Sequence, residues 1–211
     1  MNETEIRQEI VRWGHSLFER GLTAGSSGNI SAKLDDGYLV TPTNSCLGFL
    51  EAERISRLDT DGKHLAGDLP SKEVPLHMAF YRTRASARAV VHLHSTYATA
   101  LSCLSDVDAA DAIPAITPYV VMRVGKVPVL PYTRPGAPEI APLIAAKAAE
   151  HTAVLLGNHG PVVAGVSLSA AVSAIEELEE AARLALLLRG LPVRMLDAKA
   201  VAALRAAFPI P

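Results

Sequence analysis

Three histidines and one glutamate carry the chemistry that this sequence suggests. His92 and His94 lie two positions apart in a largely apolar run, and residues i and i+2 of a strand point to the same face. His159 lies far downstream where an apolar run meets a Gly-Pro turn, and Glu73 lies upstream of the pair. Three neutral imidazoles and a carboxylate, with one exchangeable position, describe a catalytic divalent-metal site.

Each of these residues also has an ordinary structural explanation. A histidine on a strand is more often a packed or surface residue than a ligand, and the chain contains 7 histidines. Glu73 would be favourable in the first turn of a helix whether or not it binds a metal. The His-x-His spacing on an apolar strand is the feature that favours ligation.

A second set of residues could hold an anion. The loop at 25–29 offers hydroxyls, an amide and backbone N–H groups that can cradle an oxyanion. Lys72 adds a positive charge at a predicted helix start, where the helix dipole also favours anions. Glycine- and serine-rich loops are common, so this pattern is weak by itself. The candidate anion ligands are Ser26, Ser27, Gly28, Asn29, Thr43, Asn44, Ser71 and Lys72.

Hydrophobic spacing predicts the elements that would position these side chains. Helices are predicted at 5–20 (ended by Gly21), 73–83 (with Ser71 near its N-cap and Pro75 in its first turn), 95–104, 138–151 and 169–189. A hairpin is predicted at 30–41 with its turn at Asp36-Gly37, and strands at 88–94, 119–132 (broken by a turn at Gly125-Lys126), 153–156 and 162–166. This mixture predicts a sheet covered by helices in a single domain, residues 1–211.

Composition excludes several classes of function. The formal net charge is -2 with no basic block, so we expect no nucleic-acid partner. No apolar run reaches the ~20 residues that a membrane span needs, so we expect no membrane partner. The polar, acidic start of the chain is unlike a signal peptide. Cys46 and Cys103 have no metal-site spacing, and we expect free thiols in a cytoplasmic protein.

Five ordered segments of the chain resemble the class II aldolase family, which includes L-fuculose-phosphate aldolase and L-ribulose-phosphate 4-epimerase. The resemblance implies a three-layer α/β/α sandwich around a largely antiparallel sheet. It also implies a homotetramer with active sites at subunit interfaces. One divalent ion per subunit is expected, with Zn²⁺ the first expectation and Mn²⁺ or another divalent ion the alternatives. The matching segments are 25–31, 41–43, 67–73, 89–94 and 158–160.

The resemblance also implies roles for individual residues. His92, His94 and His159 would ligate the metal, and Glu73 would both ligate the resting metal and serve as acid/base. The Gly/Ser/Asn loop and Ser71 would hold the substrate phosphate, which matches the anion-binding set named above.

Two departures point to one branch of the family. Lys72 and the segment 118–136 differ from L-fuculose-phosphate aldolase and resemble the 3-oxo-tetronate 4-phosphate decarboxylases, which release CO2 and dihydroxyacetone phosphate. Lys72, Arg123 and Arg134 are candidate cations for the phosphate or carboxylate of a small sugar-acid phosphate. Tyr119 and Arg123 are candidate substrate contacts, although each cation could equally be a surface charge.

The predicted function is therefore that of a metal-dependent carbon–carbon lyase. Decarboxylation of 3-oxo-tetronate 4-phosphate would leave an enediolate that a divalent ion stabilises as a Lewis acid. Aldol cleavage of a sugar phosphate shares this chemistry and is the alternative reaction, and a dehydratase of the methylthioribulose-phosphate type ranks third. A non-catalytic assembly module like the adducin head is the alternative of another class. Retention of the three histidines and Glu73 argues against it.

Overall fold

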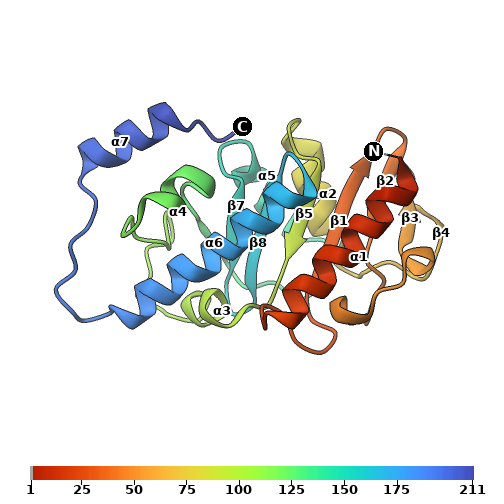
Figure 1. The fold of residues 1–211 in the computed structure, drawn as a ribbon, viewed down its shortest axis with the longest axis horizontal. Coiled ribbons are helices and arrows are strands. Elements are labelled where there is room, and N and C mark those ends of the chain that lie inside the picture. Colours follow the sequence, from red (N-terminus) through yellow and green to blue (C-terminus); the bar gives the residue numbers. More distant parts are fainter. Residues whose placement is uncertain (1) are drawn as a thin grey trace.

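A single eight-stranded sheet organises the computed structural model, which describes residues 2–211 (Figure 1). Its strands lie in the order β4-β3-β2-β1-β5-β8-β7-β6. Pairing within the described residues is antiparallel except between β6 and β7, so the sheet is mixed and mostly antiparallel. The strands are β1 Asn29–Leu34, β2 Gly37–Val40, β3 Ser56–Leu58, β4 His64–Ala66, β5 Ala89–His92, β6 Val129–Leu130, β7 Ala153–Leu156 and β8 Gly160–Gly165.

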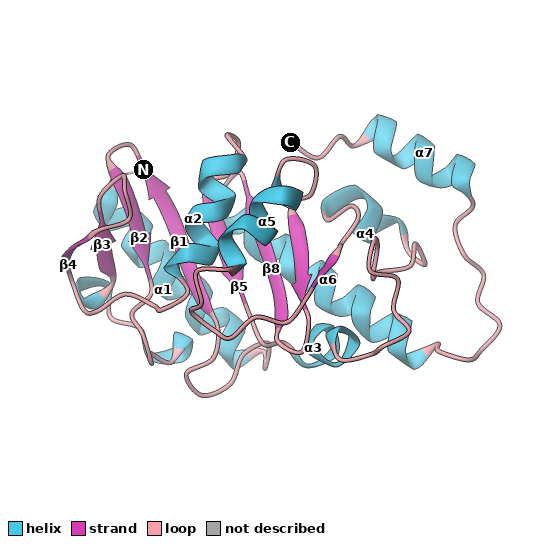
Figure 2. Cartoon of the chain, turned by 180° about the vertical axis from the view of Figure 1, so that it is seen from behind, coloured by secondary structure: helices cyan, strands magenta, loops and turns pink. Residues whose placement is uncertain are grey.

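Helices cover both faces of this sheet. Three helices lie on the face turned to the viewer in Figure 1: α1 Glu3–Glu19, α3 Thr96–Ser102 and α6 Leu168–Leu187. Helix α4 Pro118–Arg123 packs on α6, and α7 Ala198–Ala207 packs on α4. The opposite face, seen in Figure 2, carries α2 Val74–Thr83 and α5 Ile140–Ala148, which pack against each other. The predicted three-layer α/β/α sandwich with a largely antiparallel sheet is confirmed.

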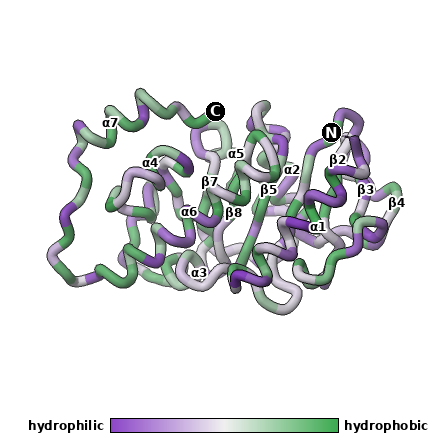
Figure 3. The backbone as a smooth tube through the Cα atoms, viewed as in Figure 1, coloured by the Kyte–Doolittle hydropathy of each residue, from purple (hydrophilic) through white to green (hydrophobic). Residues whose placement is uncertain are grey.

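The central strands are rich in hydrophobic residues (Figure 3), as expected for strands that helices cover on both faces. Along β5, Ala89 and Val91 pack with the α1–α6 layer, whereas Val90 packs with the α2–α5 layer. The same alternation turns His92, the last residue of β5, toward the α2 layer. Asn29 pairs with His92 across the β1–β5 register. The polar residues Asn29 and His92 therefore lie side by side at the edge of the hydrophobic core.

Local signals set several element boundaries at or near their predicted positions. Asn2 and Glu5 form a capping box at the start of α1, and Gly21 follows its end with φ +72°. Ser167 accepts the backbone N–H of Ala170 and starts α6 two residues from the predicted serine. The hairpin β1–β2 turns at Asp35-Asp36, next to the predicted turn.

The segment 119–132 differs from its prediction as strands. Residues 118–123 form helix α4, and the strand β6 comprises 129–130 only. Pro118 occupies the first helical turn, where proline is favourable, and Val120 and Val121 are buried as α4 packs on α6. A short β-branched run is compatible with either structure, so this packing decides it.

Three smaller differences from the prediction remain. The strand predicted at 88–94 ends at His92, so His94 lies beyond it. Helix α2 has Glu73 as its N-cap, two residues after Ser71. Helix α7 has no counterpart in the prediction. In the part of the chain from residue 2 onward, no helix has the length and apolar character needed to cross a membrane.

Candidate metal centre

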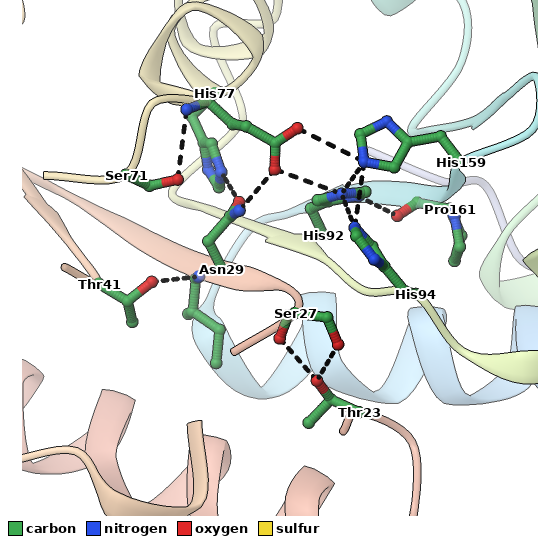
Figure 4. A network of polar contacts seen from close by, with 12 residues as sticks. Thr23, Ser27, Asn29, Thr41, Ser71, His77, His92, His94, His159 and Pro161 are labelled. Atoms are coloured by element: carbon green, nitrogen blue, oxygen red, sulfur yellow. Dashed lines mark hydrogen bonds and ion pairs between the residues drawn. The ribbon is translucent and has the colours of Figure 1, made fainter. Parts of the chain in front are cut away.

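The three predicted histidines converge on one point at the end of the sheet (Figure 4). His92 ends β5, His94 lies two residues further on, and His159 lies in the turn between β7 and β8. Their Nε2 atoms are 3.1 Å apart for His92 and His94, 3.3 Å for His92 and His159, and 3.0 Å for His94 and His159. The tertiary structure thus gathers nitrogen atoms from two parts of the chain.

Burial keeps these imidazoles neutral. The Nδ1 of His92 lies 2.9 Å from the carbonyl oxygen of Pro161, and a carbonyl only accepts, so this nitrogen holds the ring proton. The Nε2 of His92 is therefore unprotonated, and its lone pair can bind a metal ion. Burial lowers the pKa of His92 to about 3, and burial likewise lowers the pKa of His94 and His159. Neutral imidazole is the form that binds metals.

Glu73 completes the cluster from the start of α2. Its Oε2 lies 3.5 Å from the Nε2 of His92, and its Oε1 lies 3.5 Å from the Nε2 of His159. Asn29 donates a hydrogen bond of 2.8 Å from Nδ2 to Oε2. Burial raises the pKa of Glu73, but His92, the Asn29 hydrogen bond and His159 together hold that pKa below its ordinary value. The carboxylate is consequently ionised at neutral pH.

The donor set fits a divalent ion. One ligand atom from each of Glu73, His92, His94 and His159 lies within 4.8 Å of the others. Tetrahedral bonds of about 2.0–2.1 Å would place ligand atoms roughly 3.4 Å apart, close to the observed spacing of the imidazole nitrogens. A neutral imidazole can present an Nε2 lone pair, and a cation between the three rings would be attracted to all of them. Imidazole and carboxylate ligands suit zinc and several other divalent ions alike.

A cavity of about 250 Å³ opens beside the cluster and is lined by Glu73, His94 and His159. All of the candidate anion ligands predicted from the sequence lie on its wall: Ser26, Ser27, Gly28, Asn29, Thr43, Asn44, Ser71 and Lys72. Three of the four candidate metal ligands and the candidate anion donors therefore face one shared pocket.

Close packing explains the glycine in the donor-rich loop. Gly28 has φ +80°, and a Cβ there would lie 2.9 Å from the carbonyl oxygen of His92. Only glycine suits both conditions. The loop is also held by Thr23, whose Oγ1 donates to the carbonyl oxygen of Ser27 at 2.7 Å (Figure 4). The loop backbone is thus fixed directly against the strand that carries His92.

Asn29 has a role that the sequence alone did not reveal. Its Nδ2 donates to Glu73, while its Oδ1 meets the Nε2 of His77, a fully buried residue of α2. The amide is therefore bonded at both ends, and it orients Glu73 besides lining the pocket. His77 was not among the candidate residues predicted from the sequence. Its spacing of four residues from Glu73, one helical turn, is the signal that could have identified it.

The remaining predicted cations are placed differently from one another. Arg134 lines a second small cavity together with Glu73 and His159, so it lies next to the cluster. Tyr119 and Arg123 lie on α4, where the guanidinium carbon is 5.9 Å from the centre of the tyrosine ring. Neither residue lines the cavity beside the His/Glu cluster. Their assignment as substrate contacts stays a prediction.

Comparisons with known proteins agree with this arrangement. Residues 8–186 match the family described as "Class II Aldolase and Adducin N-terminal domain". The 3-oxo-tetronate 4-phosphate decarboxylase of Pectobacterium atrosepticum is 52% identical over 204 residues, which cover 96% of this chain and 94% of that protein. The L-fuculose phosphate aldolase of Haemophilus influenzae is 36% identical, over 93% of this chain and 90% of that protein.

The fold is shared with solved relatives as well. The crystal structure of YgbL from Escherichia coli superimposes with a TM-score of 0.94 at 50% identity, covering 96% of this chain and 99% of that one. Likeness at this level extends over almost the entire sheet and its helices.

Proposed function

This chain belongs to the class II aldolase and adducin N-terminal domain family, and we propose that it decarboxylates 3-oxo-tetronate 4-phosphate to dihydroxyacetone phosphate and CO2. Relatives of about half identity over nearly the full length are named decarboxylases, so the chain is an enzyme of the carboxy-lyase class. The observation that carries the substrate proposal is the single pocket in which Lys72 and the hydroxyl-rich loop lie beside the His/Glu cluster.

The pocket offers separate groups for the two anionic ends of such a substrate. Ser26, Ser27, Thr43 and Ser71 would donate hydrogen bonds to the phosphate. Lys72 would attract either the phosphate or the carboxylate. Arg134 stands near the other side of Glu73, where a second anionic group could be held.

The reaction breaks the bond between the carboxylate carbon and C2, and the bonding electrons move onto the neighbouring ketone as an enediolate. His92, His94, His159 and Glu73 would hold a divalent ion, which supplies Lewis-acid stabilisation of that developing negative charge. One proton must then reach C2. We assign its delivery to Glu73, which takes the proton up from water in the open pocket.

Several finer points belong to this proposal and rest on the sequence and the family. We propose one ion per subunit, with zinc ahead of manganese, and a homotetramer with active sites at subunit interfaces. We also keep the cytoplasmic location and the single domain, residues 1–211, as predictions. Metal analysis of the purified protein and light scattering test the first two points.

Aldol cleavage of a sugar phosphate is the second candidate function, favoured by the 36% identical L-fuculose phosphate aldolase. Product analysis separates the two. We expect equal amounts of CO2 and dihydroxyacetone phosphate from a synthetic 3-oxo-tetronate 4-phosphate. Cleavage of fuculose 1-phosphate to lactaldehyde at a comparable kcat/KM, without CO2 from the oxo acid, would overturn the proposal in favour of the aldolase. A protein that purifies without stoichiometric metal would instead favour a non-catalytic module.

A further inference from the structure

A buried line of hydrogen bonds runs from Glu73, in the His/Glu cluster, into the core between α2 and β1. Glu73 accepts from Asn29, and Asn29 is bonded to His77. The Nδ1 of His77 lies 2.7 Å from the Oγ of Ser31, and that Oγ lies 2.7 Å from the hydroxyl of Tyr81. The line thus connects the carboxylate to a tyrosine that is 4% exposed.

Chemistry fixes the direction of every bond in this line. An ionised Glu73 only accepts, so the NH2 group of Asn29 must face it and the Oδ1 of Asn29 must face His77. The Nε2 of His77 therefore donates to that oxygen. A neutral ring has one proton, so its Nδ1 accepts from the hydroxyl of Ser31. Ser31 in turn accepts from Tyr81. Each donor points toward the carboxylate.

The line is neutral as well as directional. Burial lowers the pKa of His77 to about 4, and burial raises the pKa of Tyr81 well above its ordinary value. Both side chains are therefore uncharged at neutral pH. Aligned hydrogen bonds in a site of low polarity polarise one another. The hydrogen bond that the Asn29 amide donates to Glu73 is therefore stronger than the same bond would be in isolation.

The backbone geometry makes this arrangement regular. Glu73, His77 and Tyr81 are spaced by four residues, which is about 6 Å along a helix. Asn29 and Ser31 are spaced by two residues, which is about 6.8 Å along a strand. The two repeats nearly match where α2 lies over β1, so the strand side chains alternate with the helix side chains.

We propose that His77, Ser31 and Tyr81 are positioning residues that hold the Asn29 amide in one orientation and thereby fix the Glu73 carboxylate for metal binding and proton delivery. The part of this inference that concerns proton delivery rests on the proposed function. None of the three lines the pocket, and Ser31 and His77 are at most 1% exposed, so they act through Asn29 and not on the substrate.

The test replaces His77 in the full-length metal-loaded protein. His77→Leu removes both ring nitrogens and leaves the Asn29 amide free to turn. His77→Gln restores a side chain that can donate to Asn29 and accept from Ser31. Phe80→Leu is the matched control, because Phe80 is fully buried on the same helix and lies outside the line. Metal affinity is measured by chelator competition, and kcat and KM are measured on the oxo acid phosphate.

We expect His77→Leu to weaken metal binding by roughly 10-fold or more, as loss of a group that orients a ligand typically does. Its kcat should fall by about 10-fold or more while KM changes by less than about 3-fold. His77→Gln should stay within about 3-fold of the wild type in both. Nitrogen NMR of the wild-type ring should show the proton of His77 on Nε2.

Two outcomes overturn the proposal. If His77→Leu matches Phe80→Leu in metal affinity and kcat, His77 only fills the core. If the proton of His77 lies on Nδ1, the direction argued above is wrong. Absence of CO2 from every oxo acid phosphate would instead refute the proposed function. The metal-affinity difference between His77→Leu and His77→Gln would then still support the positioning role.

Discussion

Acid should destabilise this protein in a way that His77→Gln partly removes. His77 is fully buried and neutral, and burial, opposed by Glu73, lowers its pKa from 6.5 to about 4. Between these two values the unfolded chain binds more protons than the folded one, so stability falls as the pH falls. The loss starts near the unfolded pKa and stops below the folded pKa.

The size of this effect follows from the same numbers. At about pH 5.5, one unit below the unfolded pKa, a neutral buried histidine costs about 1.4 kcal/mol of the free energy of unfolding. His92 contributes in the same direction because its pKa is about 3. The wild type should therefore lose about 1.4 kcal/mol more than His77→Gln between about pH 7.5 and 5.5.

Urea unfolding of both proteins at the two pH values, with metal in excess, measures this difference. Titration of the metal ligands is common to both proteins and cancels in the comparison. His64→Gln, which replaces an exposed histidine on β4, is the control and should lose as much stability as the wild type. Equal losses in the wild type and His77→Gln would refute the assignment of His77 as a neutral buried group.

Three further predictions concern the pocket. Glu73→Gln should fold and bind substrate but lose turnover by about 10²-fold or more, the usual scale of acid–base catalysis, and near-normal turnover would make Glu73 only a helix-start residue. Lys72→Met should raise KM for the oxo acid phosphate by roughly 10-fold through loss of a charged contact, which steady-state kinetics at two salt concentrations can test. Gly28→Ala should destabilise the protein by roughly 1–3 kcal/mol and weaken metal binding, since its Cβ meets the carbonyl of His92 at φ +80°. Unchanged thermal unfolding and metal affinity would contradict that reading.

Local sequence was sufficient wherever neighbours along the chain decide the outcome. The His92/His94 spacing, the hairpin over 30–41 and the ends of α1 depend on strand periodicity, turn residues and caps, all of which act within a few residues. The loop at 25–29, predicted to bind an anion, lines the cavity beside the His/Glu cluster, and it was recognisable because its donors are contiguous in the chain.

Tertiary structure decided everything that depends on which segments meet. The segment 118–123 became a helix because its buried valines pack on α6, a partner that local pattern does not reveal. Asn29 acquired its contacts with Glu73 and His77 only because β1 lies beside β5 and beneath α2. Those contacts join residues far apart in the sequence, so they depend on the order of the strands in the sheet. The spacing of residues within one segment does not determine that order.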